Sequence, residues 1–291
     1  MPPVQQNNRN HLGDRTQGPV TSLAPKPFGR RLLVSDYVGN QIAIVAADGR
    51  VEWRTPAEKP QNSWRLANGN ILFSHVHGAR EVRPDQSVAW EYAADPKTEV
   101  QGCQPLADGR VLVVECGPGR LIEVDRDGRI AKEIKVPLKT VKTHEQMRGC
   151  QKTPDGRYLV SAKGDRAILE LDADGRLLRS LPVNGDVHDV RELADGHWLI
   201  ACGEGDGVLE VDRAGQTVWH VGSMDVAMNP LYLVSGVERL PDGHTLVMNW
   251  LGHGHLGATA QFFEIDAQKR LVREFTDHQN FRSINHVQVL E

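Results

Sequence analysis

The sequence predicts an all-β fold, a six-bladed β-propeller with four antiparallel strands in each blade, and three observations lead to it. Short apolar runs alternate with Asp-Gly or Asn-Gly pairs, which favour tight turns because Gly adopts positive φ without a steric cost. This pattern repeats with a period of forty to fifty residues. Each end of the sequence also holds the part of a repeat that the other end lacks.

Residues 187–221 contain one complete repeat, VHDVRELADGHWLIACGEGDGVLEVDRAGQTVWHV. Two turns, at Asp195-Gly196 and at Gly215, and a glycine-rich link between them divide this stretch into short apolar runs. The expected strands are residues 187–193, 197–202, 208–212 and 217–221. Two turns and a link per repeat give the four strands of a propeller blade.

The residue two positions before each first turn fixes the spacing of the repeats. These anchor residues are Leu66, Leu106, Thr153, Leu193 and Leu240, with gaps of 40, 47, 40 and 47 residues. A period of this length suits four strands plus links of variable length.

The two ends of the sequence complete each other. Residues 31–54 contain three strands of a blade but no first strand, and residues 284–291 are a first strand with nothing after it. We expect the C-terminal strand to pair with the N-terminal three, which closes the ring and removes exposed sheet edges. The predicted organisation is a disordered polar tail at residues 1–29 and a propeller at residues 30–291.

Composition excludes several classes of partner. A net charge of -4 gives no general attraction to nucleic acid. No apolar run approaches the roughly 20 residues of a membrane-spanning helix. The N-terminal stretch lacks the apolar segment of a signal peptide, so the cellular location is left open by the residues themselves.

The two faces of the predicted ring differ. Short, uniform Asp-Gly turns lie on one face, here called the bottom face. The opposite, top face carries the long links at residues 136–147, 222–234, 251–261 and 276–284. Function tends to lie on variable loops held by a rigid scaffold, so we place the site on the top face; neutral insertions are the alternative.

The first strand of each blade lines the axis, so its residues can be assigned by their distance from the anchor. Two positions before the anchor stand Trp64, Gln104, Gln151, Arg191, Glu238 and Gln288. Four positions before it stand Asn62, Gly102, Gly149, Asp189, Gly236 and His286, on the same face by the two-residue period. One step further out, a rim is formed by Gln61, Gln101, Arg148, His188, Ser235 and Asn285.

Acid–base candidates lie along this polar surface. Counting across each turn places Glu115 opposite Gly102, Asn249 opposite Gly236 and Asp36 opposite His286. The predicted catalytic residues are His188, His286, Glu115 and Asp189, a set that suits elimination or hydrolysis. The alternative is that Asp36 and His286 only latch the ring.

Predicted substrate-binding residues surround the same mouth. Arg148 and Arg191 suit a carboxylate or sulfate, because guanidinium groups bind such anions bidentately, and the alternative is a salt-bridged lining. Trp64 and Trp250 are placed to stack on a sugar or aromatic ring. The remaining candidates are Gln101, Gln104 and Asn249.

Histidines from different blades suggest a metal site. His188, His286 and His75 are the candidate ligands for a divalent ion such as Mn, Fe, Zn or Ca. No spacing in the sequence is that of a zinc motif, and histidine also occurs where no site is expected.

The repeats resemble those of bacterial propellers with quinoprotein-like, PQQ-like repeats. The resembling segments include LANGNILFSH (66–75), LADGRVLVVE (106–115) and LPDGHTLVMNW (240–250). In blade style they are similar to arylsulfotransferases and to streptogramin and oligogalacturonate lyases. That resemblance implies axial histidines, which VHDV (187–190) and NHVQ (285–288) match, a divalent metal, and a periplasmic or secreted location.

A quinone cofactor is not expected. The chain is shorter than the quinone dehydrogenases that these blades resemble, and it has no adjacent cysteine pair. The leading hypothesis is an enzyme with lyase or hydrolase chemistry, acting on an anionic or carbohydrate-like small molecule in a polar pocket on the top face. The alternative is a non-catalytic propeller that binds a ligand or a protein partner on its top loops.

Overall fold

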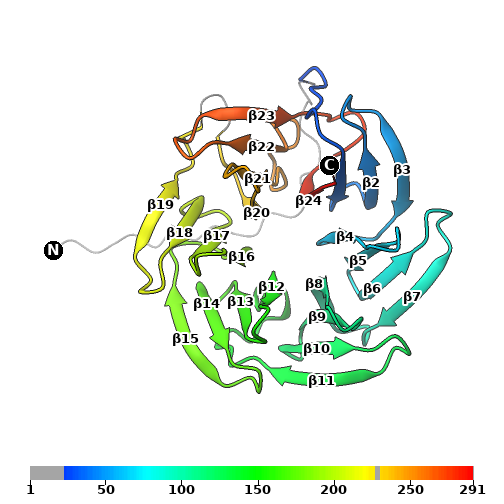
Figure 1. The fold of residues 1–291 in the computed structure, drawn as a ribbon, viewed down its shortest axis with the longest axis vertical. Helices are drawn as coiled ribbons and strands as arrows, with labels where there is room; N and C mark the ends of the chain where they lie inside the picture. Colours follow the sequence, from blue (N-terminus) through cyan, green and yellow to red (C-terminus); the bar gives the residue numbers. More distant parts are fainter. Residues whose placement is uncertain (1–22, 227–229, 291) are drawn as a thin grey trace.

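The computed structural model describes residues 23–226 and 230–290. Within them, six four-stranded antiparallel sheets surround a central axis as the blades of a propeller (Figure 1). The predicted fold class is therefore confirmed. One 3₁₀ helix, η1 (Thr143–Glu145), interrupts the strands, and no helix in the described part of the chain is long and apolar enough to cross a membrane.

Each blade runs from an inner strand at the axis to an outer strand at the periphery. Blade 1 contains β24 (Ile284–Val289), β1 (Leu32–Asp36), β2 (Gln41–Val45) and β3 (Val51–Pro56). Blade 2 contains β4 (Ser63–Arg65), β5 (Ile71–His75), β6 (Gly78–Val82) and β7 (Val88–Ala93). Blade 3 contains β8 (Glu99–Pro105), β9 (Val111–Cys116), β10 (Arg120–Val124) and β11 (Ile130–Lys135).

The second half of the ring repeats this order. Blade 4 contains β12 (Cys150–Lys152), β13 (Tyr158–Ala162), β14 (Ala167–Leu171) and β15 (Leu177–Pro182). Blade 5 contains β16 (Asp189–Glu192), β17 (Trp198–Ala201), β18 (Val208–Val211) and β19 (Thr217–Val221). Blade 6 contains β20 (Val234–Arg239), β21 (Thr245–Asn249), β22 (Phe262–Ile265) and β23 (Leu271–Phe275).

The ring closes as predicted, because β24 pairs antiparallel with β1 and completes blade 1. The residues just before the expected boundary at residue 30 also belong to the fold. The amide of Lys26 donates to the carbonyl of Thr276 at 2.7 Å. Phe28 is 2% exposed, with its ring 5.1 Å from that of Phe262. Residues 1–22 of the predicted tail lie outside the described residues.

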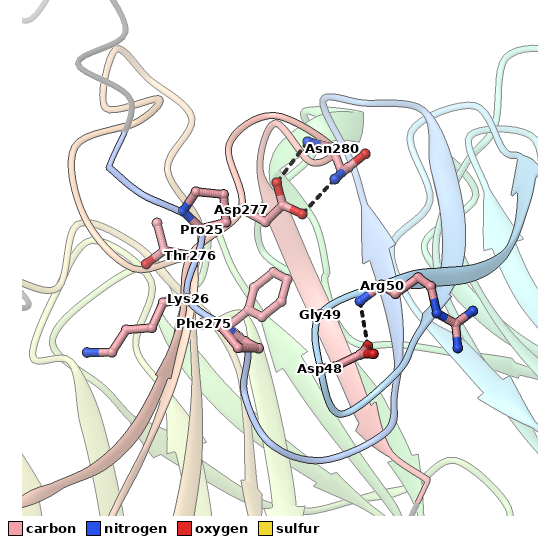
Figure 2. Close-up of a pocket in the computed structure, with 10 residues that line it drawn as sticks. Pro25, Lys26, Asp48, Gly49, Arg50, Phe275, Thr276, Asp277 and Asn280 are labelled. Atoms are coloured by element: carbon pink, nitrogen blue, oxygen red, sulfur yellow. Dashed lines mark hydrogen bonds between the residues drawn. The ribbon is translucent and has the colours of Figure 1, made fainter.

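The segment through Lys26 borders a groove at the seam between blades 6 and 1 (Figure 2). The groove has a volume of about 340 Å³, and Phe275 and the turn at Asp48-Gly49 form part of its wall. It lies at the periphery of the ring, and none of the predicted site residues lines it.

The strand register differs by one residue from the predicted pairing. In blades 2 to 6, the first turn is a three-residue loop that ends in a glycine with positive φ, as at Gly69 (φ 88°), rather than a two-residue loop. Gly102 therefore faces Val114. Across the ring closure, where no turn joins the two strands, His286 faces Ser35. A shift of one residue turns every side chain to the opposite face of a strand. The predicted Glu115–Gly102, Asn249–Gly236 and Asp36–His286 pairs are therefore wrong.

Bulges add a second departure from regular pairing near the top of three inner strands. Val100 pairs with Glu115 while Gly102 pairs with Val114, so Gln101 is an extra residue. Ser235 in β20 and Asn285 in β24 are extra residues in the same way. A bulge re-aims the side chain at the extra position, and here that position belongs to the predicted rim.

Alternation along the inner strands separates core from axis as predicted. The positions between the axial ones are buried, whereas those two residues before each anchor are half-buried. The buried set is Ser63, Cys103, Cys150, Val190, Val237 and Val287.

Buried glutamates on third strands join neighbouring blades near the bottom face. Oε2 of Glu81 in blade 2 pairs with Nη2 of Arg126 in blade 3 at 2.6 Å. Oε2 of Glu210 in blade 5 pairs with Nη2 of Arg239 in blade 6, also at 2.6 Å. The carboxylate of Glu123 likewise accepts from Lys152. We call these three glutamates, with the equivalent Glu264, which is buried and lies 3.5 Å from Arg30 of blade 1, the glutamate latches.

Candidate functional site

The top mouth of the axis is surrounded by the predicted rim, one residue from each blade. We keep the name rim for Gln61, Gln101, Arg148, His188, Ser235 and Asn285. Three rim residues occupy the bulges, and three present a buried polar atom that has no hydrogen-bond partner. Those three atoms are Gln101 Oε1, His188 Nε2 and Asn285 Oδ1.

Arg148 places a buried cation at the mouth. The residue is 7% exposed, and its Nη1 donates to the carbonyl oxygens of His144 at 2.7 Å and Met147 at 3.0 Å. Its Nη2 lies 3.2 Å from Nε2 of His144. Burial lowers the pKa of Arg148 from its usual value. These contacts hold the guanidinium in one orientation.

Glu99 and His144 join this group, although sequence reasoning did not include them in the site. Nδ1 of His144 lies 2.7 Å from Oε2 of Glu99, which also accepts from Nε2 of Gln101 at 3.0 Å. Since Arg148 can only donate, Nε2 of His144 accepts and its Nδ1 carries the proton. The sequence did place His144 four residues before Arg148. The helix η1 turns the chain there and brings the two side chains into contact.

His188 stands beside this cation with an unpartnered ring nitrogen. Its Nε2 is shielded from solvent and makes no hydrogen bond. Burial, followed by the positive charges of Arg148 and Lys163, holds the pKa of His188 well below its usual value. Gly203 leaves room for the ring, because a Cβ there would lie 2.9 Å from Cδ2 of His188. The imidazole is therefore neutral at neutral pH.

A small cavity of about 70 Å³ opens next to this group, between blades 1, 2 and 3. Gln101 lines it and leaves its Oε1 without a partner. The other lining residues are Tyr37, Lys59, Gln61, Val76, Glu99, Val100 and His144.

Aromatic side chains extend the mouth on the blade 6 side. The ring of Trp250 lies 6.0 Å from that of Tyr37, edge to face, and 4.9 Å from that of His253. Gly252 allows this position, because a Cβ there would overlap the Trp250 ring. His253 is held by Glu204, whose Oε1 is 2.7 Å from its Nδ1, and this contact raises the pKa of His253. Trp250 thus packs between Tyr37 and His253 on the top face, and the stacking role expected for it stays a prediction.

Arg191 crosses the axis below the rim. Its guanidinium lies 5.6 Å from the ring of Trp64 in blade 2, across the axis from blade 5, and its Nη2 is 3.1 Å from Oδ2 of Asp189. Burial raises the pKa of Asp189. The ring of His286 lies 5.5 Å from that of Trp64, and burial, then the charge of Arg191, lowers its pKa to about 3. Four predicted site residues therefore meet in the channel, deeper than His188.

Three other predicted site residues bind neighbouring chain segments. Glu115 accepts from Oη of Tyr92 in blade 2 and from Nε of Arg120 in its own blade, both at 2.7 Å. Asn249 accepts from the amide of Tyr232 at 2.9 Å and donates to a carbonyl in the same loop.

Gln104 is the third of these residues, and it ties β8 to β12. Its Oε1 accepts from the amide of Lys152 at 2.8 Å. Asp36, the expected partner of His286, instead accepts from the amides of Arg282 at 2.9 Å and Ser283 at 2.8 Å. It therefore anchors the loop before β24.

The three predicted metal ligands do not come together. His75 ends β5, with its Nε2 near Gly78 in the same blade. Within the described residues, two groups of three His, Cys, Asp or Glu have ligand atoms within 4.8 Å of one another, and neither contains His75, His188 or His286. Those groups are Asp195 with His197 and Glu210, and Asp242 with His244 and Glu264, near the bottom face.

Solved structures share this architecture. A protein of unknown function from Bacteroides caccae is 28% identical and has a TM-score of 0.83, over 90% of this chain and 100% of that chain. Streptogramin B lyase is 13% identical, with a TM-score of 0.61 over 88% of this chain and 85% of that chain.

A catalytically inactive His-to-Ala variant of virginiamycin B lyase from Staphylococcus aureus, with quinupristin, is also similar. It is 12% identical, with a TM-score of 0.63 over 88% of this chain and 86% of that chain. At identities this low, the two lyases share the fold alone with this chain.

A family model gives the more specific result. No protein in a search of curated proteins matches the chain. The PQQ_2 model, described as outer membrane protein assembly factor BamB, matches residues 6–154, which is more than half of the chain. The six-bladed propeller with PQQ-like repeats described above therefore belongs to the PQQ_2 family.

Proposed function

We propose that the top mouth binds a small anionic or carbohydrate-like molecule and acts on it by lyase or hydrolase chemistry, with His188 as the proton acceptor. One observation carries the proposal: Nε2 of His188 is shielded, has no hydrogen-bond partner, and stands beside the buried guanidinium of Arg148. An unpartnered buried polar atom costs free energy, so its retention favours a role in binding or catalysis.

The charges around His188 fit an anionic substrate. The guanidinium of Arg148 and the ammonium of Lys163 disfavour a second positive charge on the imidazole. A bound carboxylate or sulfate offsets those cations and therefore makes His188 a stronger base in the complex than in the free protein. Substrate binding and proton transfer are coupled in this way.

Two reactions suit this arrangement. In an elimination, the proton on the carbon next to the carboxylate passes to Nε2 of His188, the bond to the leaving group breaks with its electron pair, and a carbon–carbon double bond forms. In a hydrolysis, His188 takes a proton from water as the water oxygen bonds to the attacked atom, and the bond from that atom to the leaving group breaks with its electron pair. Arg148 binds the anionic group in both reactions.

Neither reaction is routed through a divalent metal. The ligands expected for Mn, Fe, Zn or Ca were His188, His286 and His75, and these residues do not fit one ion. The ring of His286 instead lies beside Trp64 and the cation of Arg191, a setting that disfavours a further positive charge.

The test is a screen of sugar acids and sulfate esters by thermal shift, followed by product analysis by mass spectrometry. We expect at least one compound to raise the melting temperature and to be converted. His188→Gln should abolish conversion but keep binding, whereas Arg148→Met should abolish both. His220→Gln, on outer strand β19, is the matched control and should change neither. Conversion that survives in His188→Gln contradicts the proposal.

The second candidate is a non-catalytic module that holds a protein partner on its top loops. The size of the cavity favours it: about 70 Å³ is well below the ~300–1,000 Å³ of ordinary small-molecule pockets. An acidic side chain of a partner would then occupy the position next to Arg148. Binding of an acidic peptide that is lost in Arg148→Met, with no compound of the screen bound, favours this candidate.

A further inference from the structure

We infer that the small cavity beside Gln101 receives a hydroxyl group of the substrate, and hence that the substrate is a hydroxylated carboxylic acid of the sugar-acid class. This inference rests on the proposed function and narrows its ligand. It concerns a subsite distinct from the base, on the opposite side of Arg148 from His188.

The cavity presents an acceptor whose orientation is fixed. Nε2 of Gln101 donates to Oε2 of Glu99 at 3.0 Å, so the amide cannot flip without losing that bond. Its Oε1 consequently points away from Glu99 and has no partner. Gln101 is 5% exposed and lines the cavity, so a group in the cavity is the available donor.

The surroundings favour a neutral donor over an ammonium group. Lys59 lines the same cavity, and Arg148 lies behind His144. Oε2 of Glu99 already accepts from Gln101 and faces Nδ1 of His144. Lys59 and Arg148 would repel the positive charge of a ligand's ammonium group, whereas a hydroxyl donates a hydrogen bond without adding charge.

The volume of the cavity limits what enters it. One water occupies about 30 Å³ of liquid, so about 70 Å³ holds one hydroxyl-bearing carbon but not a sugar ring. The rest of the molecule lies in the mouth above. Tyr37 joins the two regions, because it lines the cavity and its ring contacts Trp250.

His144 relates this subsite to the anion-binding group. It lines the cavity, and its Nε2 lies 3.2 Å from Nη2 of Arg148. A hydroxyl bound to Gln101 is therefore about one side chain away from a carboxylate bound near Arg148. Sugar acids carry both groups at such a separation on one small molecule.

The experiment compares probes that differ in one group. Binding of D-glucuronate, D-galacturonate, cyclohexanecarboxylate and D-glucose to the full chain is measured by calorimetry. We expect one of the sugar acids to bind at least about tenfold more tightly than cyclohexanecarboxylate, which has the carboxylate but no hydroxyls, because one well-made hydrogen bond is worth about that factor. Glucose, which lacks the carboxylate, should bind more weakly than that sugar acid.

Variants separate the subsite from the rest of the mouth. Gln101→Met removes the hydrogen-bond acceptor but keeps a side chain of similar volume. In this variant, the affinity for the sugar acid should lie within about threefold of the affinity for cyclohexanecarboxylate. Gln151→Met is the matched control: Gln151 also stands on an inner strand, but its Oε1 accepts from the amide of Glu192 at 2.7 Å. This control should keep the preference for the sugar acid.

The outcomes distinguish the two proposals. Equal binding of both sugar acids and cyclohexanecarboxylate to the unmodified protein, or a preference that survives in Gln101→Met, overturns the hydroxyl subsite and leaves a cavity that holds water only. The comparison on the unmodified protein decides this even where the variant fails to fold. Absence of binding for every acid, or binding unchanged in Arg148→Met, overturns the proposed anion site itself.

Discussion

The bottom and top faces of this propeller hold different kinds of buried polar group. Near the bottom, Glu123 accepts from Lys152 and Tyr158, both at 2.5 Å, and pairs with Arg110 at 2.8 Å. At the top, Gln101 and His188 each keep a buried polar atom without a partner. At the bottom, charged pairs hold the blades together, although Oε2 of Glu123 and of Glu264 makes no hydrogen bond there. At the top, the unpartnered atoms belong to neutral side chains, which suit a ligand.

The glutamate latches provide the largest test of this comparison. Glu123→Ala removes a buried carboxylate that Lys152, Tyr158 and Arg110 share, and loss of one partner from a buried ion pair costs about 3–5 kcal/mol. We expect a loss of that size in the free energy of unfolding, measured with denaturant. Asp127→Ala removes an exposed carboxylate from the same blade and is the control. A loss below about 1 kcal/mol would contradict the assignment of Glu123 as a latch.

The axial histidine His286 should make the protein sensitive to acid. Its pKa is about 3 in the folded state, against 6.5 for the ordinary side chain, so the unfolded state binds more protons between these values. Stability therefore falls as pH drops below about 6.5, on the order of 2 kcal/mol by pH 5. His286→Gln should show a flatter dependence in denaturant unfolding between pH 5 and 7.

His197, near the bottom face, should show the opposite and smaller dependence. Its hydrogen bond to Glu210 raises its pKa, so its stabilisation is complete below about pH 6.5 and is lost as pH rises through the folded-state pKa. Arg157 occupies the equivalent position in blade 4 and keeps its charge at every pH. His197→Arg should therefore remove this part of the decline between pH 6 and 8. An unchanged slope would show that the imidazole does not titrate against Glu210.

His188 should give the smallest effect on stability. Because its Nε2 makes no hydrogen bond, His188→Gln removes no polar contact of that atom, and we expect the free energy of unfolding to change by less than about 1 kcal/mol. The same variant should abolish conversion of substrate. If the free energy of unfolding fell by as much as in Glu123→Ala, His188 would instead stabilise the fold, and the contrast between the two faces would be wrong.

The Asp-Gly and Asn-Gly turns and the length of the sequence repeat were sufficient to predict the architecture. Asp-Gly pairs located the hairpins, and the missing first strand at residues 31–54 required β24 to close the ring. The pairing across each hairpin was wrong because Asp-Gly is compatible with loops of two or three residues, and the two differ by one residue in register. Glu115 was misplaced for this reason, since a single step reverses the direction of a side chain. Asp36 was misplaced because the same count was applied across the ring closure, where no turn joins β24 to β1.

The mouth itself was only partly predictable. Rim residues such as Arg148 and His188 followed from their distance to the anchors, because that distance is nearly constant in every blade. The bulge at Gln101 has no clear signal in the sequence, and η1, which brings His144 to Arg148, lies in an irregular link. Contacts between such links depend on the packing of whole blades, which a repeat pattern does not describe.

Pairing of β24 with β1 has a consequence for synthesis on the ribosome. Leu32–Asp36 leaves the ribosomal exit tunnel early, yet its partner Ile284–Val289 is translated roughly 250 residues later. Blade 1 thus begins first and is finished last, with an open inner edge throughout elongation. Because unpaired edges invite intermolecular pairing, we expect nascent chains stalled before residue 284 to be the aggregation-prone species and the natural clients of chaperones.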